Sequence, residues 1–194
     1  MTTLVGLTGP LVRLFLRIDA AQPSDEVLRK ASDFWQARRR GRIMPPESEM
    51  AELPGAIAAH VFTGRSMTNG SRHWIVTKAG RDAAAILQIK DAARLEIGNR
   101  RIAVRLRKLF DMVADKSEPV SAMFELGGRG KERRLVEIFV APVTGSESNT
   151  HAVFGTVNSR LEARRRQVAV SRTADAAWHP APRQGARRGS GDGG

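Results

Sequence analysis

Extended apolar runs alternate with short polar breaks in the second half of the chain. Three runs rich in β-branched and aromatic residues cover Pro119–Leu126, Arg133–Val143 and Thr150–Asn158. The breaks between them, residues 127–130 and 145–149, are rich in Gly, Ser and Asn. Because such breaks favour tight reversals of the chain, this region predicts three consecutive antiparallel strands.

Two further strands are predicted earlier, at His60–Ser66 and His73–Ala79. The dipeptide Asn69-Gly70 lies between them. It is a strong signal for a two-residue hairpin turn, because both residues tolerate a positive φ. These two strands should therefore pair antiparallel to each other.

Helical spacing of apolar residues marks three other segments. The first helix is predicted from Ser24, as its N-cap, to Gly41, where glycine favours termination. A short helix is predicted over Arg81–Ile89 and a longer one over Ile102–Lys116. Pro119 follows the longer helix and disfavours its continuation.

The N-terminal residues 1–22 are predicted to be a leader, either amphipathic or disordered. Leu4–Ile18 is mostly apolar but contains Arg13 and Arg17. It is shorter than the roughly 20 residues that a membrane-spanning helix needs. Leu11, Leu14, Phe15 and Ile18 share one helical face, so a short amphipathic helix is expected here. It would dock on a partner protomer or touch a membrane surface, and we favour docking on protein.

The predicted folded domain is residues 23–158, and residues 159–194 form a basic extension. Arg160–Gln167 is predicted to continue as a charged helical turn. From about Val168 the composition shifts to Ala, Pro, Gly, Ser and Arg. Such a segment cannot bury enough apolar surface to offset chain entropy, so the tail is predicted to be disordered.

The composition restricts the chemistry. The 194 residues contain no cysteine, which excludes disulfides, thiolate metal sites and cysteine nucleophiles. The absence of cysteine also suits a cytoplasmic protein. A hydrophobic share of 41% supports one core, and an aromatic share of 5% makes that core mainly aliphatic.

The net charge is +12, of which +5 comes from Ser159 onward. A basic excess favours contact with nucleic acid, anionic lipid or an acidic protein, or it simply supports solubility. Arg38–Arg42 and Arg164–Arg166 are the clusters that would grip phosphates. A basic nucleic-acid-binding protein is therefore one hypothesis for this chain.

The order of the predicted elements is a helix, two strands, a helical stretch and three strands. They can form a five-stranded antiparallel sheet of spatial order 2-1-5-4-3, with the central helices on one face and the N-terminal helix on the other. The fold class is therefore α+β. This is the element order of a PAS domain.

Local motifs support that comparison. Phe34-Trp35, then Arg39-Arg40-Gly41-Arg42 and Met44-Pro45, resemble the "YW…LRxGRxxP" opening of a group of bacterial stand-alone PAS-like proteins. The chain is similar to the group at Trp35, Arg39, Gly41, Arg42, Pro45, Pro54, His60, Gly80 and Pro142. The similarity covers roughly residues 31–158, and the Leu-Thr-Gly stretch that usually follows the second strand is missing.

The resemblance implies a sensory or regulatory module of signal transduction that binds a small ligand or a protein partner, often as a homodimer. A cysteinyl-flavin or thioester chromophore needs a cysteine and is excluded. Haem-binding relatives use a histidine near the helix before the third strand, where this chain has none, so haem is not expected. The residues leave open a non-covalent flavin or a small apolar metabolite.

A ligand pocket, if present, should lie between the sheet and the central helices. The candidates for its lining are Phe62, Trp74, Val76, Ile86, Leu106, Phe110, Phe124, Ile138 and Phe154. The competing interpretation, which we favour, is that these side chains simply fill a core.

Catalytic motifs are absent from the sequence. His60, His73, His151 and His179 have no metal-ligand spacing, although His60 and His73 flank a hairpin and could lie close together. No GxSxG elbow, phosphate-binding loop or dinucleotide motif occurs. We therefore predict neither an enzyme nor a metal protein.

Overall fold

The computed structural model describes residues 15–19, 23–67, 72–89, 96–127, 133–145 and 150–161. The chain divides into two units, residues 1–163 and 164–194, and every described residue belongs to the first. The strands are β1 (Arg17–Asp19), β2 (Val61–Met67), β3 (His73–Ala79), β4 (Val120–Leu126), β5 (Arg134–Thr144) and β6 (Thr150–Leu161). The helices are α1 (Glu26–Arg39), the short 3₁₀-helix η1 (Glu47–Met50), α2 (Gly55–Ala58), α3 (Arg81–Leu87) and α4 (Arg100–Lys116).

All six strands form one antiparallel sheet in the order β1-β4-β5-β6-β2-β3. The five predicted strands are β2 to β6, and their order across the sheet is the predicted 2-1-5-4-3. The predicted strand count is wrong by one, because β1 adds a sixth strand beside β4. The fold is α+β, as the sequence indicates.

The sixth strand replaces part of the helix expected at residues 11–18. Arg17 pairs with Met123, and Ile18 pairs with Ala122. Phe15 is buried and meets Phe124 edge-on, with 6.0 Å between the ring centres. Pairing with the free edge of β4 satisfies backbone groups that a short isolated helix would leave to water, so tertiary contact overrides the local helical pattern. Residues 1–14 lie outside the described residues.

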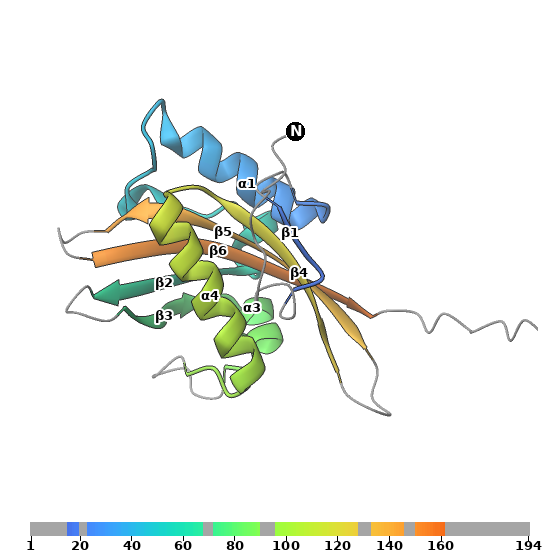
Figure 1. The fold of residues 1–194 in the computed structure, drawn as a ribbon. Coiled ribbons are helices and arrows are strands. Elements are labelled where there is room, and N and C mark those ends of the chain that lie inside the picture. Colours follow the sequence, from blue (N-terminus) through green and yellow to red (C-terminus); the bar gives the residue numbers. More distant parts are fainter. Residues whose placement is uncertain are drawn as a thin grey trace, which may run out of the picture. The chain divides into compact units, whose positions relative to one another are not determined.

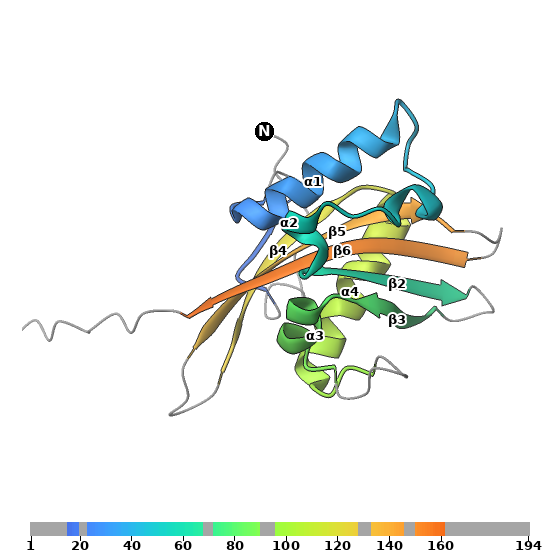
Figure 2. The same cartoon turned by 180° about the vertical axis from the view of Figure 1, so that it is seen from behind.

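The sheet carries helices on both faces, as Figures 1 and 2 show from opposite sides. The central strand β5 illustrates the division. Ile138 and Val140 face α4, whereas Phe139 and Ala141 face α1, and all four are buried. Because side chains alternate along a strand, a central strand covered on both faces is apolar at nearly every position.

The α4-side core joins the sheet to α3 and α4. Its buried members include Phe62, Val76, Leu87, Ile102, Leu106, Leu109, Phe110, Val113, Phe124, Val136, Ile138 and Val153. On α4 these residues recur at helical spacing along one face, which is the reason this segment forms an amphipathic helix.

The α1-side core joins the opposite face of the sheet to α1, η1 and α2. Its buried members are Leu28, Ala31, Trp35, Met50, Ile57, Val61, Phe139, Ala141, Val143, Ala152 and Phe154. Phe154 therefore lies on the face opposite to the one predicted for it, since the alternation along β6 places Val153, and not Phe154, toward α4.

Several predicted boundaries differ from the structure by one to three residues, and two of these differences change the contacts of the chain. The N-cap of α1 is Asp25 and not Ser24, because the Asp25 side chain accepts hydrogen bonds from the backbone N–H groups of Val27 and Leu28. The last strand continues through Arg160 to Leu161, where a helical turn was predicted, since β6 pairs with β5 as far as Arg134. Residues 162–194 and the Asn69-Gly70 turn lie outside the described residues.

Two glycines allow close approaches inside the fold. A Cβ atom on Gly80 would lie 2.2 Å from the carbonyl oxygen of Ala58. A Cβ atom on Gly155 would lie 2.1 Å from the Phe62 ring. A side chain at either position would force backbone or ring atoms apart, so the contacts of α2 with the start of α3, and of β6 with Phe62, both depend on glycine.

Candidate functional site

The region between α4 and the sheet is filled by side chains. Of the nine predicted pocket residues, Phe62, Val76, Leu106, Phe110, Phe124 and Ile138 are buried in the α4-side core, and Trp74 and Ile86 pack against it. Phe110 is central to this packing. Its ring lies 5.1 Å from the Trp74 ring and 6.0 Å from the Phe62 ring, centre to centre. The geometry of these side chains is that of a packed core.

The polar end of Trp74 is tied to α4. Its indole Nε1–H donates to the Asp111 carboxylate over 2.8 Å, and its ring lies 6.5 Å from the His151 ring. Next to it, the Arg72 guanidinium forms an ion pair with Asp115. These contacts join β3 to the C-terminal half of α4.

A recess of about 330 Å³ opens near the C-terminal end of α4. It is lined by Met44, Ala114, Ser117, Pro142, Val143, Thr144, Gly145, Thr150, His151 and Ala152. None of the nine predicted pocket residues lines it. Sequence patterns do not reveal this recess, because it is assembled from α4, the β5–β6 hairpin and the segment before η1, which are far apart in the chain.

The N-terminus of α1 is held on the sheet by two polar side chains. Glu137, a buried residue of β5, accepts hydrogen bonds from the Ser24 backbone N–H and hydroxyl, each over 2.6 Å. Asn158 of β6 donates to the second carboxylate oxygen of Asp25 over 2.9 Å. Asp25 thereby caps α1 and joins it to β6. We call Ser24, Asp25, Glu137 and Asn158 the α1 clamp.

The C-terminal half of α1 is fixed by a buried tryptophan. Trp35 is fully buried, and its indole N–H donates to the backbone carbonyl of Pro142 over 2.9 Å. β4 begins at Val120, which lies opposite Val140 of β5. Pro142 lies past this point on β5, so its missing N–H costs no hydrogen bond to β4. This hydrogen bond joins two of the motif residues, Trp35 and Pro142, which are 107 residues apart in the chain.

The arginine motif closes the turn after α1. Arg39 donates to the backbone carbonyl of Arg42 over 2.9 Å, and Arg42 donates back to the Arg39 carbonyl over 3.2 Å. The chain turns through two residues of positive φ, Arg40 at 46° and Gly41 at 82°. Arg42 also donates to Glu49 over 2.7 Å, and this contact holds the pKa of the Glu49 carboxyl below its ordinary value. Two of the arginines predicted to grip phosphates therefore hold their own turn.

Two prolines of the motif continue this connection toward the sheet. The carbonyl of Pro45 accepts a hydrogen bond from the backbone N–H of Thr144 over 2.9 Å. Pro54 is the N-cap of α2, and its carbonyl accepts from the backbone N–H of Ile57. The motif residues therefore act mainly as structural joints.

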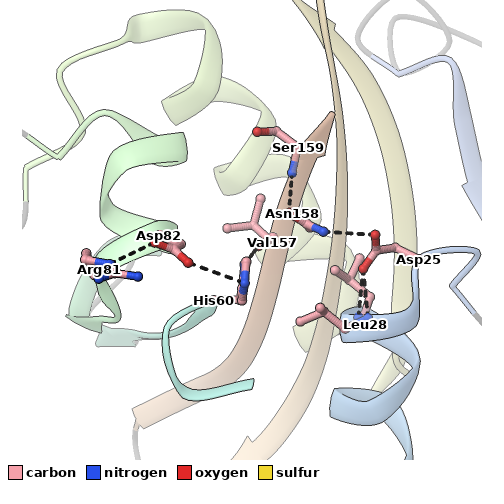
Figure 3. A network of polar contacts seen from close by, with 9 residues as sticks. Asp25, Leu28, His60, Arg81, Asp82, Val157, Asn158 and Ser159 are labelled. Carbon is pink, nitrogen blue, oxygen red and sulfur yellow. Dashed lines mark hydrogen bonds and ion pairs between the residues drawn. The ribbon is translucent and has the colours of Figure 1, made fainter. Parts of the chain in front are cut away.

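His60 joins three elements (Figure 3). Its Nδ1 lies 3.2 Å from the carbonyl oxygen of Val157 on β6, and its Nε2 lies 3.5 Å from the carboxylate of Asp82 on α3. Asp82 is also approached by Arg81 at 3.1 Å. Both ring nitrogens face an acceptor, so neither is positioned as a free general base, and the arrangement is that of a structural histidine.

The predicted proximity of His60 and His73 is wrong. His60 precedes β2, whereas His73 begins β3 and pairs with Met67 at the other end of β2. An antiparallel pair brings the end of one strand beside the start of the next, which leaves these two residues at opposite ends of the hairpin. Within the described part of the chain, no cluster of three or more His, Asp or Glu side chains could hold a metal ion.

Comparisons with known proteins give little further information. No protein-family model matches the sequence. The search of curated proteins also finds no match. Among the described residues, no helix is long and apolar enough to cross a membrane.

Two solved structures are similar to parts of this chain. One is an RNA-binding light-oxygen-voltage receptor, at 15% identity and a TM-score of 0.34; the similarity covers 52% of this chain and only 29% of that chain. The other is a fungal LOV domain photoreceptor, at 11% identity and a TM-score of 0.38, covering 70% of this chain and 95% of that chain.

Proposed function

We propose that this chain is a non-enzymatic PAS-like regulatory module of bacterial signal transduction, located in the cytoplasm, which acts mainly through protein contacts. The observation that carries the proposal is the sheet order 2-1-5-4-3 with α4 packed over one face. This is the arrangement that the order of the predicted elements gives, and the motif residues form joints of the fold.

The filled α4-side core favours a protein partner over a ligand in the interior. Phe62 and Phe110 are at most 2% exposed and lie against each other where such a ligand would need space. A small polar molecule in the recess beside His151 is the remaining ligand hypothesis. The partner we propose is a second copy of the chain, for which the edge strand β3 offers the half-exposed side chain of Ile75.

Native mass spectrometry of protein purified from its own host tests this proposal. We expect the mass of the chain alone or of its dimer, with no excess that disappears on denaturation. A non-covalent mass excess would contradict the protein-contact proposal and indicate a small-molecule sensor.

The variant Ile75→Lys sharpens the test if a dimer is found. A charge at the β3 edge should disfavour strand pairing between copies, so the dimer fraction should fall. The matched variant Val104→Lys changes another exposed aliphatic residue, on α4, and should leave the dimer intact. Equal dimer fractions in both variants would exclude β3 as the contact.

A further inference from the structure

The outer face of α4 carries a compact basic stripe. Arg100, Arg101, Arg107 and Lys108 are exposed on one side of the helix, with the half-exposed Val104 among them. The first acidic residue of α4 is Asp111. With a rise of about 1.5 Å per residue, the stripe is about 12 Å long.

These four cations have no compensation in the described part of the chain. None of them forms an ion pair there, whereas the described ion pairs of Arg42, Arg65 and Arg72 use nearby carboxylates. Arg105, on the flank of the stripe, is used internally: it stacks on the Phe124 ring and donates to the Arg101 carbonyl. Burial and the neighbouring Arg101 lower the pKa of Arg105, as expected where positive charge is concentrated.

The position of the stripe is unfavourable for the helix itself. Arg100 and Arg101 lie in the first turn of α4, where the helix dipole is positive and acidic residues are preferred. The backbone N–H groups of Arg101 and Ile102 are already capped by the Asn99 side chain. An external anion would therefore meet the side chains of the stripe and not the end of the helix backbone. These cations therefore do not contribute to the stability of the helix.

The residues around the stripe indicate which kind of anion it binds. Val104 is the one large apolar side chain exposed on the described α4. One valine offers too little apolar area for the centre of a protein interface or for insertion into a membrane surface. The large exposed apolar side chains of the described residues include no aromatic ring on which single-stranded bases could stack. The length of the stripe is comparable to the major-groove width of about 12 Å, so its two ends can face phosphates of both strands.

We propose that the outer face of α4 binds the phosphate backbone of double-stranded nucleic acid without reading its sequence. This property goes beyond the regulatory module proposed above and does not depend on it. It also moves the nucleic-acid hypothesis from the Arg38–Arg42 cluster, in which Arg39 and Arg42 close their own turn, to α4.

Fluorescence anisotropy of the full chain with a labelled DNA duplex of about 20 base pairs, between about 50 and 200 mM salt, tests the proposal. The α4 variant combines Arg100→Gln, Arg101→Gln, Arg107→Gln and Lys108→Gln. A control variant removes the same charge from exposed positions outside α4: Arg29→Gln, Lys78→Gln, Arg81→Gln and Arg133→Gln. Glutamine keeps the helix propensity of the replaced residues, so α4 should still fold.

We expect the wild-type chain and the control variant to bind the duplex. The α4 variant should bind roughly tenfold or more weakly, and its slope of log affinity against log salt should be smaller by about 3.6, which corresponds to four lost phosphate contacts. Its melting temperature should equal or exceed that of the wild-type chain, because the helix loses unfavourable cations.

Three outcomes would overturn the proposal. The first is equal weakening by the α4 and control variants, which would mean that only total charge matters. The second is wild-type affinity in the α4 variant together with loss of binding when Arg164, Arg165 and Arg166 become Gln, which would assign the activity to the tail. The third is binding of polyglutamate or phosphatidylserine vesicles by a chain that does not bind the duplex.

Discussion

The two faces of the sheet hold their helices by different means. On one face, α4 is attached mainly by a continuous layer of aromatic and aliphatic side chains that extends from Phe62 to Phe124. Its polar contacts to Trp74 and Arg72, made by Asp111 and Asp115, are partly exposed to water. On the other face, α1 combines a smaller apolar core with directional polar contacts at both ends, the α1 clamp and the bond from Trp35 to Pro142. Apolar packing is distributed and non-directional, whereas a buried hydrogen bond depends on a few atoms.

This difference indicates how each helix could respond to a signal. Moving α4 would expose a large apolar area, so that side of the molecule should behave as a rigid body. Moving the N-terminus of α1 requires the exchange of a few hydrogen bonds for water. The proposed protein contacts are therefore more easily transmitted through α1 than through α4, and the following variants test that comparison.

The largest effect should come from Phe110→Ala on the α4 side. Phe110 is 2% exposed and contacts both Phe62 and Trp74, so its removal leaves a cavity. We expect a loss of about 3–5 kcal/mol in the free energy of unfolding, measured by urea denaturation. Phe34→Ala, at a half-buried position on α1, should cost clearly less; equal losses would contradict the assignment of the larger core to α4.

The next effect should come from Trp35→Phe on the α1 side. The substitution keeps most of the buried ring but leaves the Pro142 carbonyl without its indole donor. We expect a loss of about 1–3 kcal/mol by the same measurement.

Trp74→Phe is the matched control for this variant. It removes the bond to Asp111 at a half-buried position, where water can replace the lost partner. A cost for Trp74→Phe equal to that of Trp35→Phe would show that burial of the Pro142 carbonyl is not the cause.

A smaller effect is expected when the α1 clamp is opened by Asp25→Ala. The variant loses the helix cap and the bond from Asn158. The expected cost is about 1 kcal/mol, with faster hydrogen exchange confined to the first turn of α1. Asp33→Ala removes the same side chain from an exposed position of α1 and should change little; protection lost along all of α1 would contradict a local clamp.

The smallest effect concerns pH. Arg42 lowers the pKa of Glu49 below its ordinary value of 4.5 in the folded chain. The ionised Glu49 therefore contributes stability above about pH 4.5, and the contribution is lost as the pH falls through the lowered folded pKa. In Glu49→Gln, this part of the acid dependence of the melting temperature should be absent, whereas an unchanged acid profile would show that the pair contributes nothing.

Local patterns were sufficient for most elements of the fold. His73–Ala79 was predicted with its correct bounds, and the α4 segment was predicted to within a few residues, because alternation and helical spacing report directly on which side chains are buried. The order of the five predicted strands also followed from the sequence, since three hairpins and a family resemblance leave few arrangements. The motif residues around Trp35 and Arg42 were identified, although their role as joints was not.

Only the tertiary structure decided which residues meet across the sheet. Local periodicity could not show that Phe154 faces α1, because the face of a strand residue depends on the register of the strand in the sheet. Nor could it show that Arg17–Asp19 pairs with β4 or that Glu137 lies under Ser24, because these partners are more than a hundred residues apart in the chain. The same holds for the basic stripe. The sequence contains its four cations, but whether carboxylates lie beside them is a property of the folded surface, and among the described residues none pairs with them.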